Sequence, residues 1–395
     1  MRSGTPLWLA DSAPRLKISK VAGNADVVIV GSGISGALVA EALQQAGLSV
    51  LVVDRRRPMT GSTPASTALL QFEIDTPLLE LQRRIGKPHA ARAWWRSAQA
   101  VQALSDKIAD LKLDCDFAPR NTLYLPGNTL RTPDLKREAA LRRQIGLRSE
   151  FIDGARLKAL SGIVKPGAIL SEGNGEADPV KLLSGLWRNF LKNGGRMASK
   201  VEVTGFEQSR ASVQLQTSDG KLIRARHAVF CTGYEIMKSF RPRGYKVIST
   251  WVLATRQQPE ELWPGKSLIW EAADPYIYLR ATADGRVIVG GEDEPFSDDV
   301  QRDALIPKKI AAISAKAAKL FPGIDFTPAF AWAGCFGESP TGLPAIGPLP
   351  GFTRVHAVMG FGGNGITFSM LAAQLISRAI QGLTDPDAEI FGFKS

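Results

Sequence analysis

The chain has 395 residues, of which 44% are hydrophobic and 22% are charged, as in a folded globular protein of about two domains. It contains no apolar run long enough to span a bilayer, and its first residues lack the apolar core of a signal peptide, so we expect a cytoplasmic protein. Three cysteines and three histidines are scattered without metal-ligand spacing, which argues against a disulfide framework and a bound metal. The net charge of +11 is compatible with an anionic partner, but we favour a basic surface over nucleic-acid binding, because no aromatic residues are interleaved with the densest basic run.

A βαβ unit is predicted near the N-terminus. Residues 26–30 are a short, β-branched apolar run, which is typical of a buried parallel strand. The sequence GSGISG follows at residues 31–36, and apolar residues then recur at helical spacing until Gly47 ends the helix. Residues 48–53 form a second apolar run that Asp54 closes. This order of strand, glycine-rich turn, helix and strand is typical of a dinucleotide site.

Each residue of the glycine pattern has a physical role in such a site. Gly31 permits the tight turn, Gly33 lets the backbone approach a pyrophosphate, and Gly36 lets the helix pack closely on the strand. The N–H groups at the helix start favour phosphate, and Asp54 can accept hydrogen bonds from ribose hydroxyls. The alternative is a glycine-rich turn in a βαβ unit of another kind.

A hydroxyl-rich segment follows the second strand. Residues 55–58, Arg-Arg-Arg-Pro, lead into residues 61–67, which are rich in Gly, Ser and Thr. Beside a dinucleotide fold, this segment suits a second contact with the pyrophosphate or the cofactor ring. The alternative is a plain loop that leads into a helix, with Ser66 or Thr67 near its cap.

Helices and strands alternate in the rest of the chain. We expect two helices within residues 77–111, a strand pair over 113–126, and a turn at 174–179 that caps a helix. Further helices are expected over residues 132–146, 155–161, 180–193, 300–320 and 366–381. Strands are expected over residues 197–203, 212–217, 221–225, 228–233, 246–255, 267–271, 276–281, 286–290, 330–334 and 354–359. The strands between 246 and 300 predict an antiparallel sheet that suits a substrate-binding platform.

Two later strands run into glycine. The apolar strand at 228–233 ends in Thr232-Gly233, which lets the backbone lie against a bound cofactor. The strand at 354–359 runs into the loop GFGGNG at 360–365, and a long apolar helix follows. This second strand–loop–helix unit could direct its N–H groups to the same cofactor.

With these motifs placed, residues 25–395 resemble the FAD-dependent amine and amino-acid oxidoreductases related to D-amino-acid oxidase, glycine oxidase and monomeric sarcosine oxidase. The resemblance is carried by GSGISG with Asp54, by AVFCTG, by YIYLRATADGRVIVGGED, and by SPTGLPAIGP…HAVMGFGGNGITFSMLAAQLI. It implies an α/β fold (α+β overall) in which a Rossmann-like FAD-binding domain is interleaved with an antiparallel-sheet substrate domain. The expected boundaries are 1–76, 150–245 and 328–395 for the discontinuous FAD-binding domain, and 77–149 and 246–327 for the substrate-binding domain.

The resemblance also implies where FAD binds. Asp54 and the first glycine motif would hold the ADP half, Val201 the adenine through its backbone, and residues 363–366 would lie near the isoalloxazine, where a helix start offers positive potential. The expected cofactor-binding residues are Gly31, Gly33, Ile34, Ser35, Gly36, Asp54, Arg55, Ser62, Thr63, Ser66, Thr67, Val201, Thr232, Gly233, Gly337, Gly362, Gly363, Asn364, Gly365 and Ile366.

The implied reaction removes a hydride from the carbon that bears nitrogen in a small amine or amino acid, and the resulting imine hydrolyses in water. Such enzymes orient that carbon against the flavin and exclude water, so a strong catalytic acid or base is not required. We therefore assign no catalytic residue and expect the partners to be the small-molecule substrate and either oxygen or an electron carrier.

The chain departs from the family at the substrate side. Phe336 stands where glycine-oxidase-like members commonly have an arginine that clamps the substrate carboxylate. Strand alternation places Tyr276, Tyr278 and Arg280 on one face, so Arg280 could replace that clamp. The alternative is an exposed sheet face. These four residues are the candidates for substrate binding.

Two further positions bear on the flavin. Cys335 is close to the place where monomeric sarcosine oxidases attach their flavin covalently, although a buried, inert cysteine is the commoner case. Ile288 stands where those enzymes carry a lysine that helps the flavin react with oxygen, which weakens the case for an oxidase. One alternative is therefore an FAD dehydrogenase that passes electrons to a quinone or carrier. Two others are a tRNA-modifying flavoprotein, since one relative of this fold acts on tRNA and the chain is basic, and a non-catalytic flavin-binding subunit.

Overall fold

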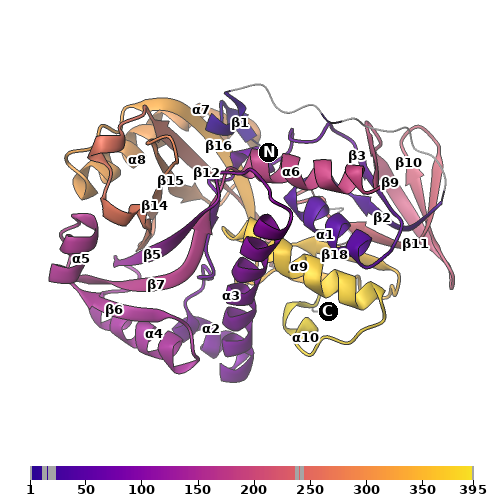
Figure 1. Cartoon of the computed structure of the whole chain (residues 1–395), viewed down its shortest axis with the longest axis horizontal. Coiled ribbons are helices and arrows are strands. Elements are labelled where there is room, and N and C mark those ends of the chain that lie inside the picture. The colour runs from indigo at the N-terminus through magenta and orange to yellow at the C-terminus, as the bar shows by residue number, and fades with distance from the viewer. Residues whose placement is uncertain (1, 11–15, 17–23, 236–239, 241–243, 394–395) are drawn as a thin grey trace.

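Two β-sheets organise the protein in the computed structural model, which describes residues 2–10, 16, 24–235, 240 and 244–393. Figure 1 shows an eight-stranded sheet on the right and a ten-stranded sheet on the left, with helix α3 (Lys87–Asp110) between them. Each sheet draws strands from distant parts of the chain. The expected α/β class, with a Rossmann-like unit and a second, largely antiparallel sheet, is confirmed.

The eight-stranded sheet contains the predicted βαβ unit. Its central order is β17-β18-β11-β2-β3-β8, and β9 and β10 continue from β11 as antiparallel strands. The bounds are β2 (Ala25–Val30), β3 (Val50–Asp54), β8 (Arg196–Ser199), β9 (Val203–Gln208), β10 (Val213–Thr217), β11 (Leu222–Phe230), β17 (Ala345–Pro348) and β18 (Val355–Met359). Strands β18, β11, β2, β3 and β8 are parallel. Val27, Val28 and Ile29 are fully buried, which explains why β2 is apolar at consecutive positions.

Helices cover the eight-stranded sheet. Helix α1 (Ile34–Gln45) packs between α6 (Pro179–Lys192) and α9 (Gly365–Ile380). The Asp178 carboxylate caps α6 by accepting hydrogen bonds from the backbone N–H groups of Val180 and Lys181. The Trp187 Nε1–H of α6 donates to the Ser32 carbonyl at 3.0 Å, so α6 holds the glycine-rich turn before α1 in place.

The ten-stranded sheet has the order β1-β16-β12-β15-β14-β13-β5-β7-β4, and β6 also pairs with β7. The bounds are β1 (Arg2–Gly4), β4 (Leu69–Leu70), β5 (Ala118–Pro126), β6 (Ser149–Asp153), β7 (Gly167–Glu176), β12 (Lys246–Thr255), β13 (Leu268–Ala272), β14 (Ile277–Ala281), β15 (Val287–Glu294) and β16 (Pro328–Glu338). Its pairs are antiparallel except for β13 with β5. The platform expected between 246 and 300 is thus part of a larger, mixed sheet.

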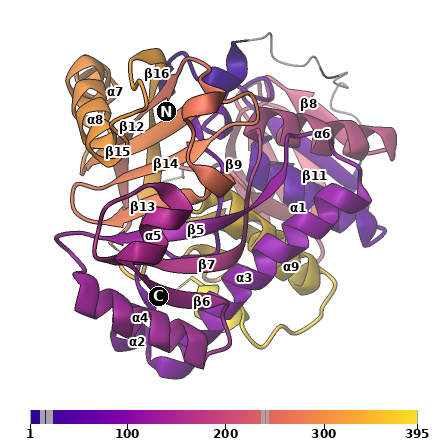
Figure 2. The ribbon, with the colours of Figure 1, turned by 60° about the vertical axis from the view of Figure 1, so that its left-hand side comes forward.

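The remaining helices pack around this sheet and connect it to the first. Helix α8 (Ile306–Leu320) packs on β12, β15 and β16, while α4 (Thr132–Gln144) and α5 (Gly154–Ser161) pack on β6 and β7. The other helices are α2 (Leu78–Ile85), α7 (Asp299–Ala304) and α10 (Ala388–Phe391). Figure 2 shows α3 running past β7 toward α1, and α3 contacts both β7 and α9, so it joins the two halves.

Several expected elements differ in the structure. Residues 113–126 contain one strand, β5, whose partners β7 and β13 come from elsewhere in the chain. The end of β7 contains residues 174–176, because they pair with β4 and β5, so only Asp178 of the expected turn caps α6. The expected helix 300–320 is interrupted at Leu305, two residues before Pro307 in the first turn of α8.

The domain boundaries remain a prediction. By strand pairing, β7 and β16 belong to the ten-stranded sheet, although they lie within the segments expected to form the FAD-binding domain. Among the described residues, no helix combines the length and hydrophobicity that crossing a bilayer requires.

His356 makes stability depend on pH. It is buried in β18, and neither ring nitrogen has a hydrogen-bond partner among the described residues. Burial, together with the nearby His227, lowers the pKa of His356 from 6.5 to about 4. Between these values the unfolded chain binds a proton that the folded protein does not, so stability falls as the pH falls through this window.

We expect His356→Leu to remove most of this dependence. In the wild type, His356 should lower the free energy of unfolding by about 2 kcal/mol between pH 7.5 and pH 5. Chemical unfolding at the two pH values measures this change. His89→Leu, at an exposed position of α3, is the control and keeps the wild-type slope. Equal slopes for the wild type and His356→Leu would contradict the assignment.

Candidate active site

A cavity of about 610 Å³ is lined by residues from both sheets. Its wall includes the turn between β2 and α1, the segment 61–71, the chain after β11, parts of β14 and β16, and the loop before α9. All the predicted cofactor-binding residues line this cavity except Gly36 and Gly337, which lie behind it. The fold therefore brings together motifs that are more than three hundred residues apart in sequence.

Two glycines of the glycine-rich turn have no room for a side chain. Gly31 has φ +114°, and a Cβ there would lie 2.2 Å from the Cys231 carbonyl oxygen. A Cβ on Gly36 would lie 2.0 Å from the Gly31 carbonyl oxygen. Both distances are far below contact, so Gly31 lets β2 approach the end of β11 and Gly36 lets α1 begin against the turn.

Asp54 fastens the end of β3 to this turn. Its Oδ2 accepts hydrogen bonds from Ser32 N at 2.6 Å and Ser32 Oγ at 2.7 Å, and its Oδ1 accepts one from Arg56 N at 2.8 Å. Oδ1 has a second lone pair, so Asp54 can still accept a hydrogen bond from a ligand. Val201 lies beside it and donates its own N–H to the Asp54 carbonyl at 2.9 Å, which leaves only the Val201 carbonyl for an adenine.

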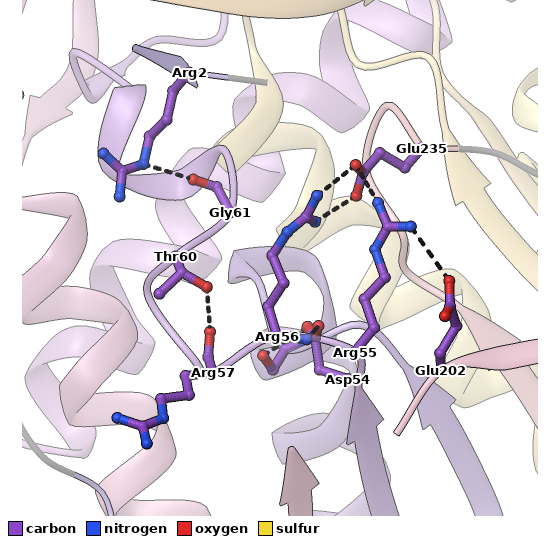
Figure 3. Close-up of polar contacts among 10 residues, drawn as sticks. Arg2, Asp54, Arg55, Arg56, Arg57, Thr60, Gly61, Glu202 and Glu235 are labelled. Carbon is purple, nitrogen blue, oxygen red and sulfur yellow. Dashed lines mark hydrogen bonds and ion pairs between the residues drawn. The ribbon is translucent and has the colours of Figure 1, made fainter. Parts of the chain in front are cut away.

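The cations of this end are paired. Figure 3 shows the side chains of Arg55 and Arg56 converging on Glu235. Arg56 Nη2 donates to Glu235 Oε1 at 2.6 Å, and Arg55 Nη1 lies 3.6 Å from Glu202 Oε1. Among the described residues, Arg55 and Arg56 are the only basic side chains that line the cavity. Its positive charge is therefore confined to the neighbourhood of Asp54.

The hydroxyl-rich segment is a wall of the cavity. Ser62, Thr63, Ser66 and Thr67 line it, with residues 63–65 in one 3₁₀ turn. The segment is held from outside by two indole N–H groups, which donate to the carbonyls of residues 65 and 66. It leads into strand β4, so the alternative of a loop entering a helix is wrong.

The loop before α9 is fixed by the segment 71–75. Gly363 N donates to Asp75 Oδ2 at 2.7 Å, Asn364 Nδ2 donates to the Glu73 carbonyl at 2.5 Å, and Thr367 Oγ1 donates to the Gln71 carbonyl at 3.0 Å. These contacts place the start of α9 at the cavity, with Gly365 and Ile366 on its wall.

Asp75 was not found by sequence analysis. No motif surrounds it, and only the fold brings it against the C-terminal glycine loop. Burial raises the pKa of Asp75 to about 6, although the Gly363 N–H opposes the rise, and the charge of Glu338 adds to it. Asp75 lines the cavity and is an exposed residue there.

The wall from the ten-stranded sheet is aromatic. The candidates Tyr276, Tyr278 and Phe336 all line the cavity, together with Trp270 of β13. The Tyr276 and Tyr278 ring centroids are 6.0 Å apart. Three of the four substrate-binding candidates therefore lie on one wall.

Arg280 does not line the cavity, and the hypothesis that it clamps a substrate carboxylate is not supported. Its side chain is buried, donates to the carbonyls of Thr67 at 2.6 Å and Ala177 at 2.8 Å, and lies 3.3 Å from Glu176 Oε2. Strand alternation correctly predicted that Tyr278 faces the cavity. It did not predict that the longer Arg280 side chain makes its contacts with buried backbone carbonyls.

Cys335 and Ile288 occupy different environments. Cys335 lines the cavity from β16, and its Sγ accepts a hydrogen bond from Arg302 Nη1 at 3.0 Å. A covalent flavin link at Cys335 stays a prediction. Ile288 is fully buried beside Trp332, and no lysine among the described residues lines the cavity.

We expect Arg280→Leu to lower the free energy of unfolding by about 3 kcal/mol, because it leaves Glu176 buried with fewer partners. Arg256→Leu, which breaks the exposed pair with Asp325, should change it by less than about 1 kcal/mol. Chemical unfolding measures both. A fully stable Arg280→Leu protein with a raised KM for carboxylate substrates alone would restore the clamp role.

The residues of the cavity fit an elongated dinucleotide cofactor, because the turn at Gly31 and the loop at Gly363 offer close backbone approach at separate places. A sequence model of the family DAO, described as FAD dependent oxidoreductase, matches residues 26–379. The chain is 25% identical to gamma-glutamylputrescine oxidoreductase from Escherichia coli, over 93% of this chain and 85% of that protein. It is 23% identical to glycine oxidase from Pseudomonas aeruginosa, over 90% of this chain and 94% of that protein. Among solved structures, glycine oxidase from Geobacillus kaustophilus has the same fold, with a TM-score of 0.78, 18% identity and coverage of 94% of this chain and 99% of that one. The chain therefore belongs to the DAO family of FAD-dependent oxidoreductases.

Proposed function

We propose that this protein oxidises a carbon–nitrogen bond of a small amine or amino acid. A hydride leaves the carbon that bears the nitrogen, and the imine product hydrolyses to a carbonyl compound and an amine. FAD, when bound, supplies the acceptor for that hydride. The names of the two curated relatives support this reaction class, because glycine and gamma-glutamylputrescine both carry an amine on a saturated carbon.

The observation that carries the proposal is the single cavity that joins a dinucleotide motif to an aromatic wall. Its described lining contains no histidine and no lysine. Such a lining suits hydride transfer, which depends on the orientation of the substrate and the exclusion of water. We assign those tasks to Tyr276, Tyr278, Phe336 and Phe361.

Three parts of the chain would hold the cofactor. The turn at Gly31 and Gly33, with Asp54, would bind the ADP half through backbone N–H groups and the carboxylate. The hydroxyls of residues 62–67 would contact the middle of the molecule. The start of α9 at Gly365 would favour negative charge on the ring.

The electron acceptor is either oxygen or a quinone or other carrier. The absence of a lysine from the described cavity wall and the burial of Ile288 favour a dehydrogenase that passes electrons to a quinone or carrier over a fast oxidase. The rate at which the reduced protein is reoxidised by oxygen, compared with a quinone, decides between them.

Gly36→Ala should weaken FAD binding by about tenfold or more, because the added methyl group displaces the start of α1 from the turn. Titration of the apoprotein with FAD, followed by quenching of flavin fluorescence, measures the dissociation constant. Gly323→Ala is the matched control, since a Cβ there meets nothing within 4 Å. Unchanged FAD binding by Gly36→Ala would remove the motif from the cofactor site.

An anaerobic screen tests the reaction itself. We expect at least one amine or amino acid to bleach the visible absorbance of the bound flavin, and the carbonyl product to appear in equal amount. Dithionite serves as the control for a reducible flavin. If dithionite bleaches the flavin and no amine or amino acid does, the proposed reaction is wrong.

A further inference from the structure

The charges on the cavity wall are unevenly distributed. The basic residues Arg55 and Arg56 lie at the end that contains Asp54, where Glu235 and Glu202 pair with them. On the wall opposite, the described ionisable residue other than tyrosine and cysteine is Asp75, beside the loop at Gly363. The substrate end is therefore acidic.

The described residues offer no cation for a substrate carboxylate at this end. Position 336 is a phenylalanine, and Arg280 is directed to backbone carbonyls away from the cavity. The guanidinium of Arg302 lies behind Cys335, where it donates to the sulfur and pairs with Asp299 at 2.6 Å. A carboxylate next to the reacting carbon would lose its hydration without gaining a charged partner.

Only one carboxylate oxygen of Asp75 accepts a hydrogen bond from the described residues. Oδ2 accepts the Gly363 N–H, whereas Oδ1 accepts no hydrogen bond from a described residue. A Cβ on Gly362 would lie 2.4 Å from Oδ2, so the glycine loop is built closely around this side chain. A bound cation would give this carboxylate a charged partner that the described residues do not supply.

A second carboxyl group adds to the negative potential. Asp293 lies beside the hydroxyls of Thr250 and Tyr276, both of which line the cavity, and its Oδ1 is buried without a hydrogen-bond partner among the described residues. Burial raises the pKa of Asp293 to about 7, against the effect of those hydroxyls, and the charge of Asp75 adds to the rise. The two carboxyl groups are thus close enough for their charges to interact.

The aromatic wall suits the same kind of ligand. Trp270 is held rigidly by stacking on Tyr124, with ring centroids 3.7 Å apart, and Tyr276 and Tyr278 lie beside it on the cavity wall. The faces of such rings attract a desolvated ammonium group.

We propose, as a consequence that rests on the proposed function, that the substrate is an amine cation without a carboxylate on the reacting carbon, bound by Asp75 and the aromatic wall of Trp270, Tyr276 and Tyr278. Asp75 is the specificity-determining residue. It takes the place in substrate recognition that an arginine takes when the substrate is an amino acid.

Matched compounds test the substrate class. The holoenzyme is mixed anaerobically with n-propylamine or 2-aminobutyrate, and with n-butylamine or norvaline, pairs of monoamines that differ only by a carboxylate on the carbon that bears the nitrogen. We expect the compound without the carboxylate to reduce the flavin with at least about a tenfold higher ratio of reduction rate to dissociation constant. Faster reduction by the amino acids overturns the inference but keeps the proposed function. No reduction by any of the four, with normal reduction by dithionite, overturns both.

A binding measurement tests Asp75 without turnover. Tetramethylammonium carries no hydrogen on nitrogen for the reaction, and its binding is read as a change in the flavin spectrum of the oxidised protein. We expect Asp75→Asn to raise its dissociation constant about tenfold, because the amide keeps the shape and can still accept the Gly363 N–H but lacks the charge. Asp75→Glu should retain part of the affinity.

Asp110→Asn is the control, since it removes one negative charge from an exposed position at the end of α3. It should bind tetramethylammonium as the wild type does. An unchanged dissociation constant in Asp75→Asn, with full FAD content, contradicts the role of Asp75. Tighter binding of acetate than of tetramethylammonium contradicts a cation-selective site.

Discussion

The contact between the segment 71–75 and the loop before α9 determines the shape of the site. The Asn364 side chain and the Gly363 N–H both donate to this segment, and a β-carbon at Gly362 would overlap the Asp75 carboxylate. Because the segment follows strand β4 of one sheet and the loop follows strand β18 of the other, this contact joins the two sheets at the cavity. The glycines at 362 and 363 are thus required by a neighbouring side chain as well as by any ligand.

Local signals predicted the dinucleotide end because its parts are neighbours in sequence. Strand β2, the glycine turn, α1 and β3 follow one another, so spacing alone placed Gly31 and Asp54 together, and the structure confirms that arrangement. The substrate end is assembled from β13, β14, β16 and the segment before α2, which meet only through long-range pairing. The position of Asp75 on the cavity wall results from this long-range pairing. No spacing rule could have connected it to a loop almost three hundred residues later.

Arg280 shows why strand alternation cannot assign a functional role by itself. Alternation determines the face on which a side chain begins, but a long arginine can extend past its neighbours to backbone carbonyls and a buried carboxylate. Arg142 behaves similarly in α4, where the basic run was interpreted as a solvated face. Its side chain is fully buried, hydrogen bonds to Glu138 at 2.8 Å and stacks on Trp94. Part of the basic composition is therefore internal and paired with acidic side chains, so the number of basic residues overstates how many lie on the surface.

The distribution of charged residues along the cavity affects where each ligand would bind. A cofactor with phosphates is anionic. The start of α1 would favour it through the helix dipole, because Arg55 and Arg56 are already paired with Glu202 and Glu235, and Asp75 at the other end would repel it. The proposed cationic substrate would instead be attracted to Asp75 and the aromatic wall. Burial strengthens both effects because the surrounding protein screens them less than water would. On the proposed substrate class, the two ligands would therefore favour different ends of one shared cavity.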